Sequence, residues 1–168
     1  MRNDDEQNAI KEMGIDASLP DPDDPSADPV AGVYFNNLSF SKLDWYLNAD
    51  TQIGQGVKNG DGTCSYRITV TLTNIMTQEE AGKLPDYVAA SAPDAARDDE
   101  RLNVSLFAPT GGNITDLTVE GTQFGLGAAT WHGIPFYSGT VDLHAGETTT
   151  ITYTLTTSAE AGDKPLTL

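Results

Sequence analysis

Two segments of this 168-residue chain alternate strictly between apolar and polar side chains, and that pattern restricts the possible folds more than any other feature. In residues 63–74 and 148–157, threonine or another polar residue takes every second position. The apolar positions between them are Cys64, Tyr66, Ile68, Val70 and Leu72 in the first segment and Ile151, Tyr153 and Leu155 in the second. A period of two places these apolar side chains on one face of a β-strand, and a second layer must cover that face.

Shorter apolar runs, separated by turn sequences, predict the remaining strands. They cover residues 30–38, 43–47, 102–107, 113–120, 123–130, 134–143 and 166–168. The sequences NGDG at 59–62 and PTGG at 109–112 are typical of turns. The connections are too short for crossover helices, apart from residues 75–101. The chain therefore predicts an all-β fold in which two antiparallel sheets pack face to face as a sandwich.

The formal charge of the chain is −16, and it is concentrated in two segments. Residues 1–29 hold nine acidic and two basic side chains, and residues 75–101 hold seven and three. We interpret both segments as solvated appendages. The first is predicted to form a short helix, over 4–13, followed by an acidic proline-rich linker, over 16–29. Residues 30–168 are predicted to form the sandwich domain, which the second segment interrupts as an excursion.

The excursion at 75–101 is predicted to be partly helical, because Thr77 can cap a short helix. Its apolar side chains at 84–88 are expected to anchor it to the sandwich, and residues 94–100 are expected to lie in solvent. Replacing 94–100 with a short Gly/Ser link should then leave the fold intact. A partner that meets this acidic segment is expected to be neutral or cationic.

The excess of acidic side chains argues against nucleic acid and anionic membranes as partners, because binding to phosphates relies on lysine and arginine. No segment of the sequence approaches the ~20 apolar residues of a membrane helix, so we expect no membrane insertion. The N-terminal residues are polar and acidic, unlike a signal peptide. We therefore expect any export signal or membrane anchor to lie outside this chain.

The single cysteine, Cys64, can form no disulfide within the chain and no zinc site. Its place on the apolar face of residues 63–74 predicts a buried and unreactive thiol. The acidic linker lacks the residue spacing of a calcium-binding loop. We therefore expect no cofactor and no tight metal site.

Two stretches resemble strands of bacterial immunoglobulin-like modules: YRITVTLTN at 66–74 and AGETTTITYTLT at 145–156. This resemblance implies an immunoglobulin-like sandwich.

A wider resemblance rests on five segments that follow one another along the chain. They are GVYFNNLSFSKLDWYL at 32–47, VTLTN at 70–74, LPDYV at 84–88, RLNVSLFAPTGG at 101–112 and the AGE turn at 145–147. In this order they resemble the C-terminal part of an uncharacterised family of actinobacterial membrane-anchored surface proteins, classified as a domain of unknown function. The resemblance implies that the chain is extracellular, at the cell surface, as part of a larger membrane-anchored protein. It implies no catalytic residues.

Motifs for catalysis are sparse in this sequence. The nucleophile motif G-x-S-x-G is absent. A pair of carboxylates for glycoside hydrolysis stays an alternative, because acidic residues are plentiful. Most of them fall in 1–29 and 75–101, where nothing is expected to hold them rigidly. The chain is therefore predicted not to be an enzyme.

The candidate ligand-binding residues are Trp131, His132 and Tyr137, which cluster with Phe136 around Gly133 and Pro135. Aromatic rings stack on the faces of sugars, and they also fill protein cores. Two interpretations are therefore open for this cluster: a ligand platform, or packing within the sandwich.

The leading hypothesis is a non-catalytic module of a bacterial cell-envelope protein, structural or adhesive, whose partner is wall or capsular glycan or a surface protein. One alternative is a dedicated carbohydrate-binding module for the same glycans. Another is an accessory domain of an envelope enzyme that processes glycan.

Overall fold

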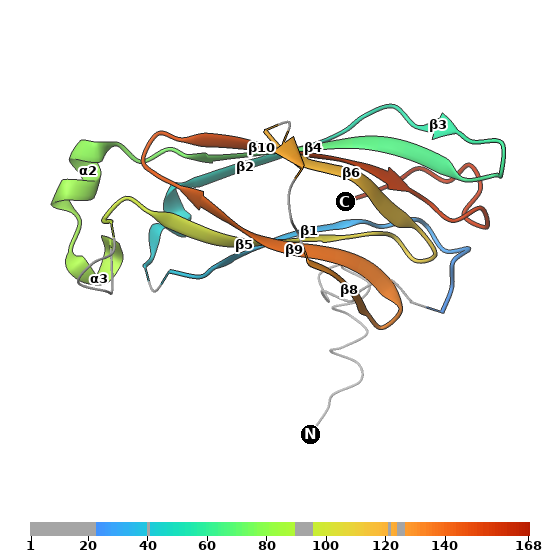
Figure 1. Cartoon of the computed structure of the whole chain (residues 1–168), viewed down its shortest axis with the longest axis horizontal. Coiled ribbons are helices and arrows are strands. Elements are labelled where there is room, and N and C mark those ends of the chain that lie inside the picture. The colour runs from blue at the N-terminus through green and yellow to red at the C-terminus, as the bar shows by residue number, and fades with distance from the viewer. Residues whose placement is uncertain (1–22, 40, 90–95, 121, 124–126) are drawn as a thin grey trace, which may run out of the picture.

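The computed structural model describes residues 23–39, 41–89, 96–120, 122–123 and 127–168. These residues form two antiparallel sheets that pack face to face (Figure 1). The predicted all-β, two-sheet antiparallel sandwich is therefore confirmed.

The first sheet has the strand order β1-β5-β9-β8, and the second has the order β2-β4-β10-β6-β7. The first sheet consists of β1 (Gly32–Asn37), β5 (Glu100–Phe107), β9 (Ile134–Leu143) and β8 (Gly127–Trp131). The second consists of β2 (Leu47–Ile53), β4 (Cys64–Asn74), β10 (Thr148–Thr156), β6 (Asn113–Val119) and β7 (Thr122–Gln123). A two-residue strand, β3 (Val57–Lys58), also pairs with β4.

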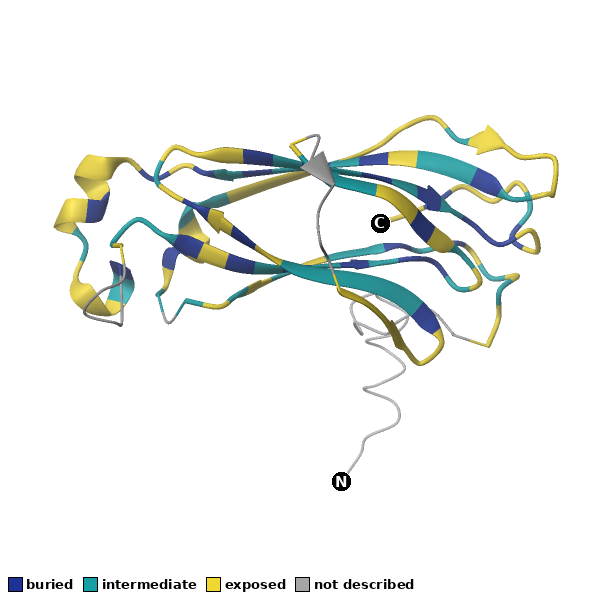
Figure 2. Cartoon of the chain, in the orientation of Figure 1, coloured by how far each residue is buried: buried dark blue, intermediate teal, exposed yellow. Residues whose placement is uncertain are grey.

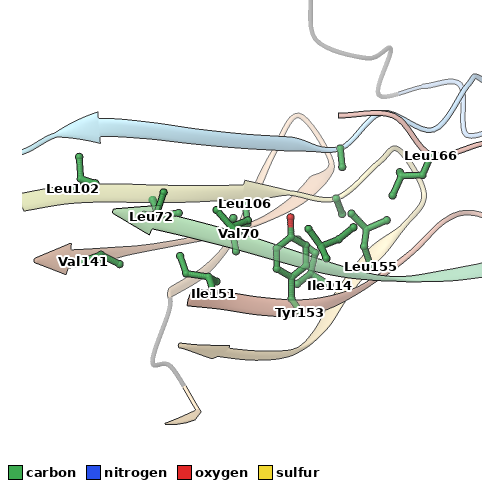
Figure 3. Packing of buried hydrophobic residues seen from close by; sticks show 14 of the residues in the cluster. Val70, Leu72, Leu102, Leu106, Ile114, Val141, Ile151, Tyr153, Leu155 and Leu166 are labelled. Atoms are coloured by element: carbon green, nitrogen blue, oxygen red, sulfur yellow. The ribbon is translucent and has the colours of Figure 1, made fainter. Parts of the chain in front are cut away.

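The two alternating segments become the central strands β4 and β10, as predicted. Their register pairs Ile68 with Tyr153 and Val70 with Ile151, so the apolar side chains of both strands share one face. The inward side chains of β5 belong to the same core: Leu102, Val104 and Leu106. Figure 3 shows Tyr153 in the middle of this core, between the two sheets. The burial predicted for Cys64 is confirmed, and its low reactivity stays a prediction.

The excursion joins β4 to β5 and lies at one end of the sandwich (Figure 1). It carries two short helices, α2 (Gln78–Lys83) and α3 (Asp86–Ala89), so its partly helical character is confirmed. Thr77 caps α2 as predicted, because its hydroxyl accepts a hydrogen bond from the Glu80 amide and the Glu80 carboxylate accepts one from the Thr77 amide. Most residues of α2 are exposed, whereas α3 is exposed at Asp86 and Tyr87 and covered at its end (Figure 2).

The way the excursion attaches differs in part from the prediction. Leu84 does anchor it, by packing against a small buried cluster formed by Leu43, Met76 and Ala81. Tyr87 is 69% exposed and anchors nothing. Of the residues 94–100 that were expected in solvent, 94–95 lie outside the described residues, residues 97–99 are half-buried, and Glu100 is fully buried as the first residue of β5. Glu100 lies two positions before Leu102 and therefore points inward, so replacing 94–100 would remove part of the sandwich.

Two predicted strands take other forms. Residues 43–46 form a 3₁₀ helix, η1 (Leu43–Tyr46), and β2 begins only at Leu47. This turn buries Leu43 while the chain passes from the first sheet to the second. Residues 166–168 form no strand; within the described part of the chain, their pairing is a single parallel bridge between Val30 and Thr167.

The predicted N-terminal helix and the start of the linker lie outside the described residues. The described end of the linker makes several contacts with the rest of the chain. The Ser158 hydroxyl donates to the carbonyl oxygen of Pro25, and the Lys164 ammonium lies 3.3 Å from the Asp28 carboxylate.

Candidate functional site

The structure brings two of the three predicted site residues together, at the hairpin between β8 and β9. Trp131 ends β8, and the ring of His132 meets its ring edge-on at 4.2 Å between centroids. His132 and Gly133 form the turn with φ angles of 48° and 80°, a conformation that suits the two-residue turn of a hairpin. Trp131 remains 43% exposed. Tyr137 lies apart from them, because it points inward from β9 and packs against the core.

The outward face of the first sheet carries a second group of aromatic side chains. Phe107 of β5 and Phe136 of β9 are directly opposite in the register, and their rings stack at 4.8 Å with 12° between their planes. Tyr34 of β1 meets Phe107 edge-on at 5.5 Å. Since Trp131 pairs with Ile134, two residues before Phe136, its side chain projects from the same face. We call these four residues, Tyr34, Phe107, Phe136 and Trp131, the aromatic face.

The ring of Tyr34 lies across Gly32, on the same strand. A Cβ atom at position 32 would be 2.5 Å from Cε2 and 3.2 Å from Cζ of that ring, so only glycine leaves room for it. Phe107 supports the ring from the side, and Tyr34 is still 49% exposed. One surface of the ring therefore rests on the sheet and the other is open to solvent.

A polar ladder crosses the same face beside the rings. The Ser138 hydroxyl donates to Oδ1 of Asn103 at 2.9 Å and lies 3.1 Å from the Ser105 hydroxyl. The Asn103 amide nitrogen donates to Ser105 at 3.3 Å. These three side chains hold one another in place on adjacent strands, so they offer fixed hydrogen-bonding groups next to the aromatic face.

The aromatic face and its polar ladder carry no charged side chain, although the whole chain has a formal charge of −16. The outward charges of the described part of β5 and β9 lie at the far end, where Arg101 and Asp142 pair at 3.1 Å. A surface of this kind suits a neutral ligand that has apolar faces and hydroxyl edges.

Sequence reasoning missed Tyr34 and Phe107 as surface residues, whereas Phe136 belongs to the aromatic cluster that the sequence indicated. The run GVYFNN in β1 has apolar side chains on both faces: Val33 and Phe35 pack against the core, and Tyr34 points outward. Alternation alone cannot assign such a run to a face. The available signal was Gly32, because a glycine inside a strand often marks the close approach of another group.

A groove of about 360 Å³ lies where β6 and β9 end and β10 begins. Three carboxylates line it: Glu120, Asp142 and Glu147. Two of them already have partners, because Asp142 pairs with Arg101 and Glu147 accepts a hydrogen bond from the His144 amide at 2.8 Å. Among the described residues, no group of three or more His, Cys, Asp or Glu side chains could hold a metal ion.

No protein family, curated protein or solved structure matched this chain. Within the described residues, the helices are all too short or too polar to cross a membrane.

Proposed function

We propose that this chain is a non-catalytic adhesive module of a bacterial cell-envelope protein and that its aromatic face binds neutral glycan. The observation that carries the proposal is an uncharged aromatic surface on a strongly acidic protein. The extracellular location and the membrane-anchored parent protein rest on the sequence resemblance described above.

The chemistry of the face supports glycan over other neutral ligands. The open surface of the Tyr34 ring offers apolar area to the C–H face of a pyranose ring. Asn103, Ser105 and Ser138 offer donors and acceptors to the hydroxyl groups at the edge of the sugar. These groups project from β1, β5 and β9, and strands position a binding site more accurately than loops do.

The proposal is tested by titrating the protein with wall and capsular oligosaccharides and recording backbone NMR shifts. Shifts are expected at Tyr34, Ser105 and Phe136. Tyr34→Ala should weaken binding about tenfold, since a stacked aromatic ring contributes about 1 kcal/mol or more.

Trp45→Ala is the matched control. Trp45 is 88% exposed on η1, outside the first sheet, so its loss should leave the affinity unchanged. Melting curves of both variants check that they fold. Equal weakening by the two substitutions, or no binding of any oligosaccharide, would refute the proposal.

A further inference from the structure

A small apolar pocket adjoins the ring of Tyr34 on the aromatic face. It has a volume of about 20 Å³ and is lined by residues that include Gly32, Tyr34, Phe107, Ala108 and Ile134. None of its lining residues carries a charge. Tyr34 and Phe107 belong both to this pocket and to the aromatic face, so a sugar stacked on Tyr34 would lie at the pocket's rim.

The size of the pocket limits what can enter it. A single water-sized group needs about 10–15 Å³, so a pocket of about 20 Å³ has room for one small group such as a methyl. Most of its lining is apolar, so a hydroxyl or an ammonium group placed there would lose more hydrogen bonds to water than it could regain. A methyl group loses none and gains about 0.8 kcal/mol from burial.

We propose that this pocket selects pyranose units that carry a methyl group, supplied either by an acetamido substituent or by a 6-deoxy carbon. The inference rests on the proposed glycan-binding function and adds the class of sugar. The methyl group enters the pocket while the pyranose ring stacks on Tyr34. Both sources of the methyl group are neutral, which matches the uncharged surroundings of the pocket.

The test uses two matched pairs of sugars, titrated at physiological ionic strength. The first pair is the β-1,4-linked trimer of N-acetylglucosamine and the same trimer with N-formyl groups, which lacks only the methyl groups. The second pair is a methyl glycoside of a 6-deoxyhexose and that of the same hexose with its 6-hydroxyl group. In at least one pair, the methyl-bearing sugar should bind about fourfold more tightly. This ratio corresponds to the roughly 0.8 kcal/mol gained by burying one methyl group. The pair that shows the difference identifies the source of the methyl group.

Saturation-transfer NMR on the unmodified protein provides a second measurement. The methyl protons of the bound sugar should receive more saturation than its ring protons, because the pocket surrounds them. Ala108→Val, which adds two methyl groups to one of the residues that line the pocket, should reduce the preference for the methyl-bearing sugar within the pair. Because Ala108 is buried, a melting curve must accompany this variant, and the saturation experiment decides the question if the variant does not fold.

The outcomes separate the inference from the proposed function. If methylated and unmethylated sugars bind equally and the methyl protons receive no excess saturation, the pocket has no selective role, although glycan binding stands. If none of the four sugars and no wall or capsular oligosaccharide binds, both proposals fail.

Discussion

Glu100 occupies a core position without the partners that a buried carboxylate needs. It is the first inward residue of β5, and neither of its carboxylate oxygens has a hydrogen-bond partner among the described residues. Burial raises the pKa of Glu100 to about 7, and the nearby negative charge of Asp44 adds to the effect. The folded protein therefore keeps this proton to higher pH than the unfolded chain does.

The sign of the resulting pH dependence follows from linkage. Below pH ~4.5 Glu100 is protonated in both states, so it carries no penalty. As the pH rises to about 7, only the unfolded chain releases the proton, and the free energy of unfolding falls by roughly 3 kcal/mol. Glu100→Gln removes this loss. Its free energy of unfolding, relative to the unmodified protein, should rise by that amount between about pH 4.5 and pH 8 in denaturant titrations.

Glu160→Gln controls for the loss of one carboxylate. Glu160 is exposed in a turn near the C-terminus, so its replacement should shift stability little and with no trend across the same pH range. A difference between Glu100→Gln and the unmodified protein that stays constant with pH would show that Glu100 is not protonated in the folded state at neutral pH.

At the scale of elements, Arg97 holds the helical excursion together. Its guanidinium donates hydrogen bonds to the carbonyl oxygens of Ala81 and Leu84 and pairs with the Asp86 carboxylate at 2.6 Å. These carbonyls lie near the end of α2, where helical hydrogen bonds run out and other donors must replace them. One side chain thus joins α2 to the start of α3.

Arg97→Ala should loosen the excursion without unfolding the sandwich. Amides of α2 and α3 are expected to exchange with solvent about tenfold faster, since two or three hydrogen bonds to partly exposed groups are lost. Amides of β4 and β10 should keep their protection, because their core contacts are untouched. Hydrogen-exchange mass spectrometry or NMR measures both.

Lys83→Ala is the matched control for the excursion. Lys83 also lies in α2, but its ion pair with Glu79 is exposed on both sides and contributes little. Exchange in α2 should therefore change only slightly. If Arg97→Ala behaved like this control, the excursion would be held by its other contacts, such as the packing of Leu84, and not by Arg97.

The elements that could be predicted from the sequence are those with a single apolar face. Residues 64–74 became β4 because every second side chain fills the core, and the turn sequences bounded the other strands. The segment at 43–46 could not be assigned in this way, since only Leu43 is buried and its contacts come from the distant Met76 and Ala81. Glu100 was misplaced for a related reason: its charge suggested solvent, whereas its strand position places it inside.

The candidate site was only partly predictable. Trp131 was identified from its aromatic neighbours, and it does lie on an exposed face. Tyr34 and Phe107 are far apart in sequence and come together only because β1 pairs with β5. No local sequence pattern reveals this contact, because it depends on how β1 and β5 pair in the first sheet.

At the scale of the whole molecule, the charge of −16 opposes the compact state. Folding brings the excess carboxylates closer together, and salt weakens their mutual repulsion. The melting temperature should therefore rise as sodium chloride increases from about 0.01 M to about 0.15 M, over which the screening length falls from ~30 Å to ~8 Å. Differential scanning calorimetry measures this rise. A falling melting temperature would mean that ion pairs such as Lys58–Asp163 outweigh the repulsion.

The bridge between Val30 and Thr167 has a mechanical consequence. Its two segments run parallel, and two hydrogen bonds join them, from the Ala31 amide to the Thr167 carbonyl at 2.9 Å and from the Thr167 amide to the Pro29 carbonyl at 3.0 Å. Tension applied to residues 29 and 168 in opposite directions would slide these segments past each other, loading both bonds together instead of peeling them apart in turn. The two segments are thereby held in a shear geometry, in which both hydrogen bonds must break together, so the pairing resists pulling along its length.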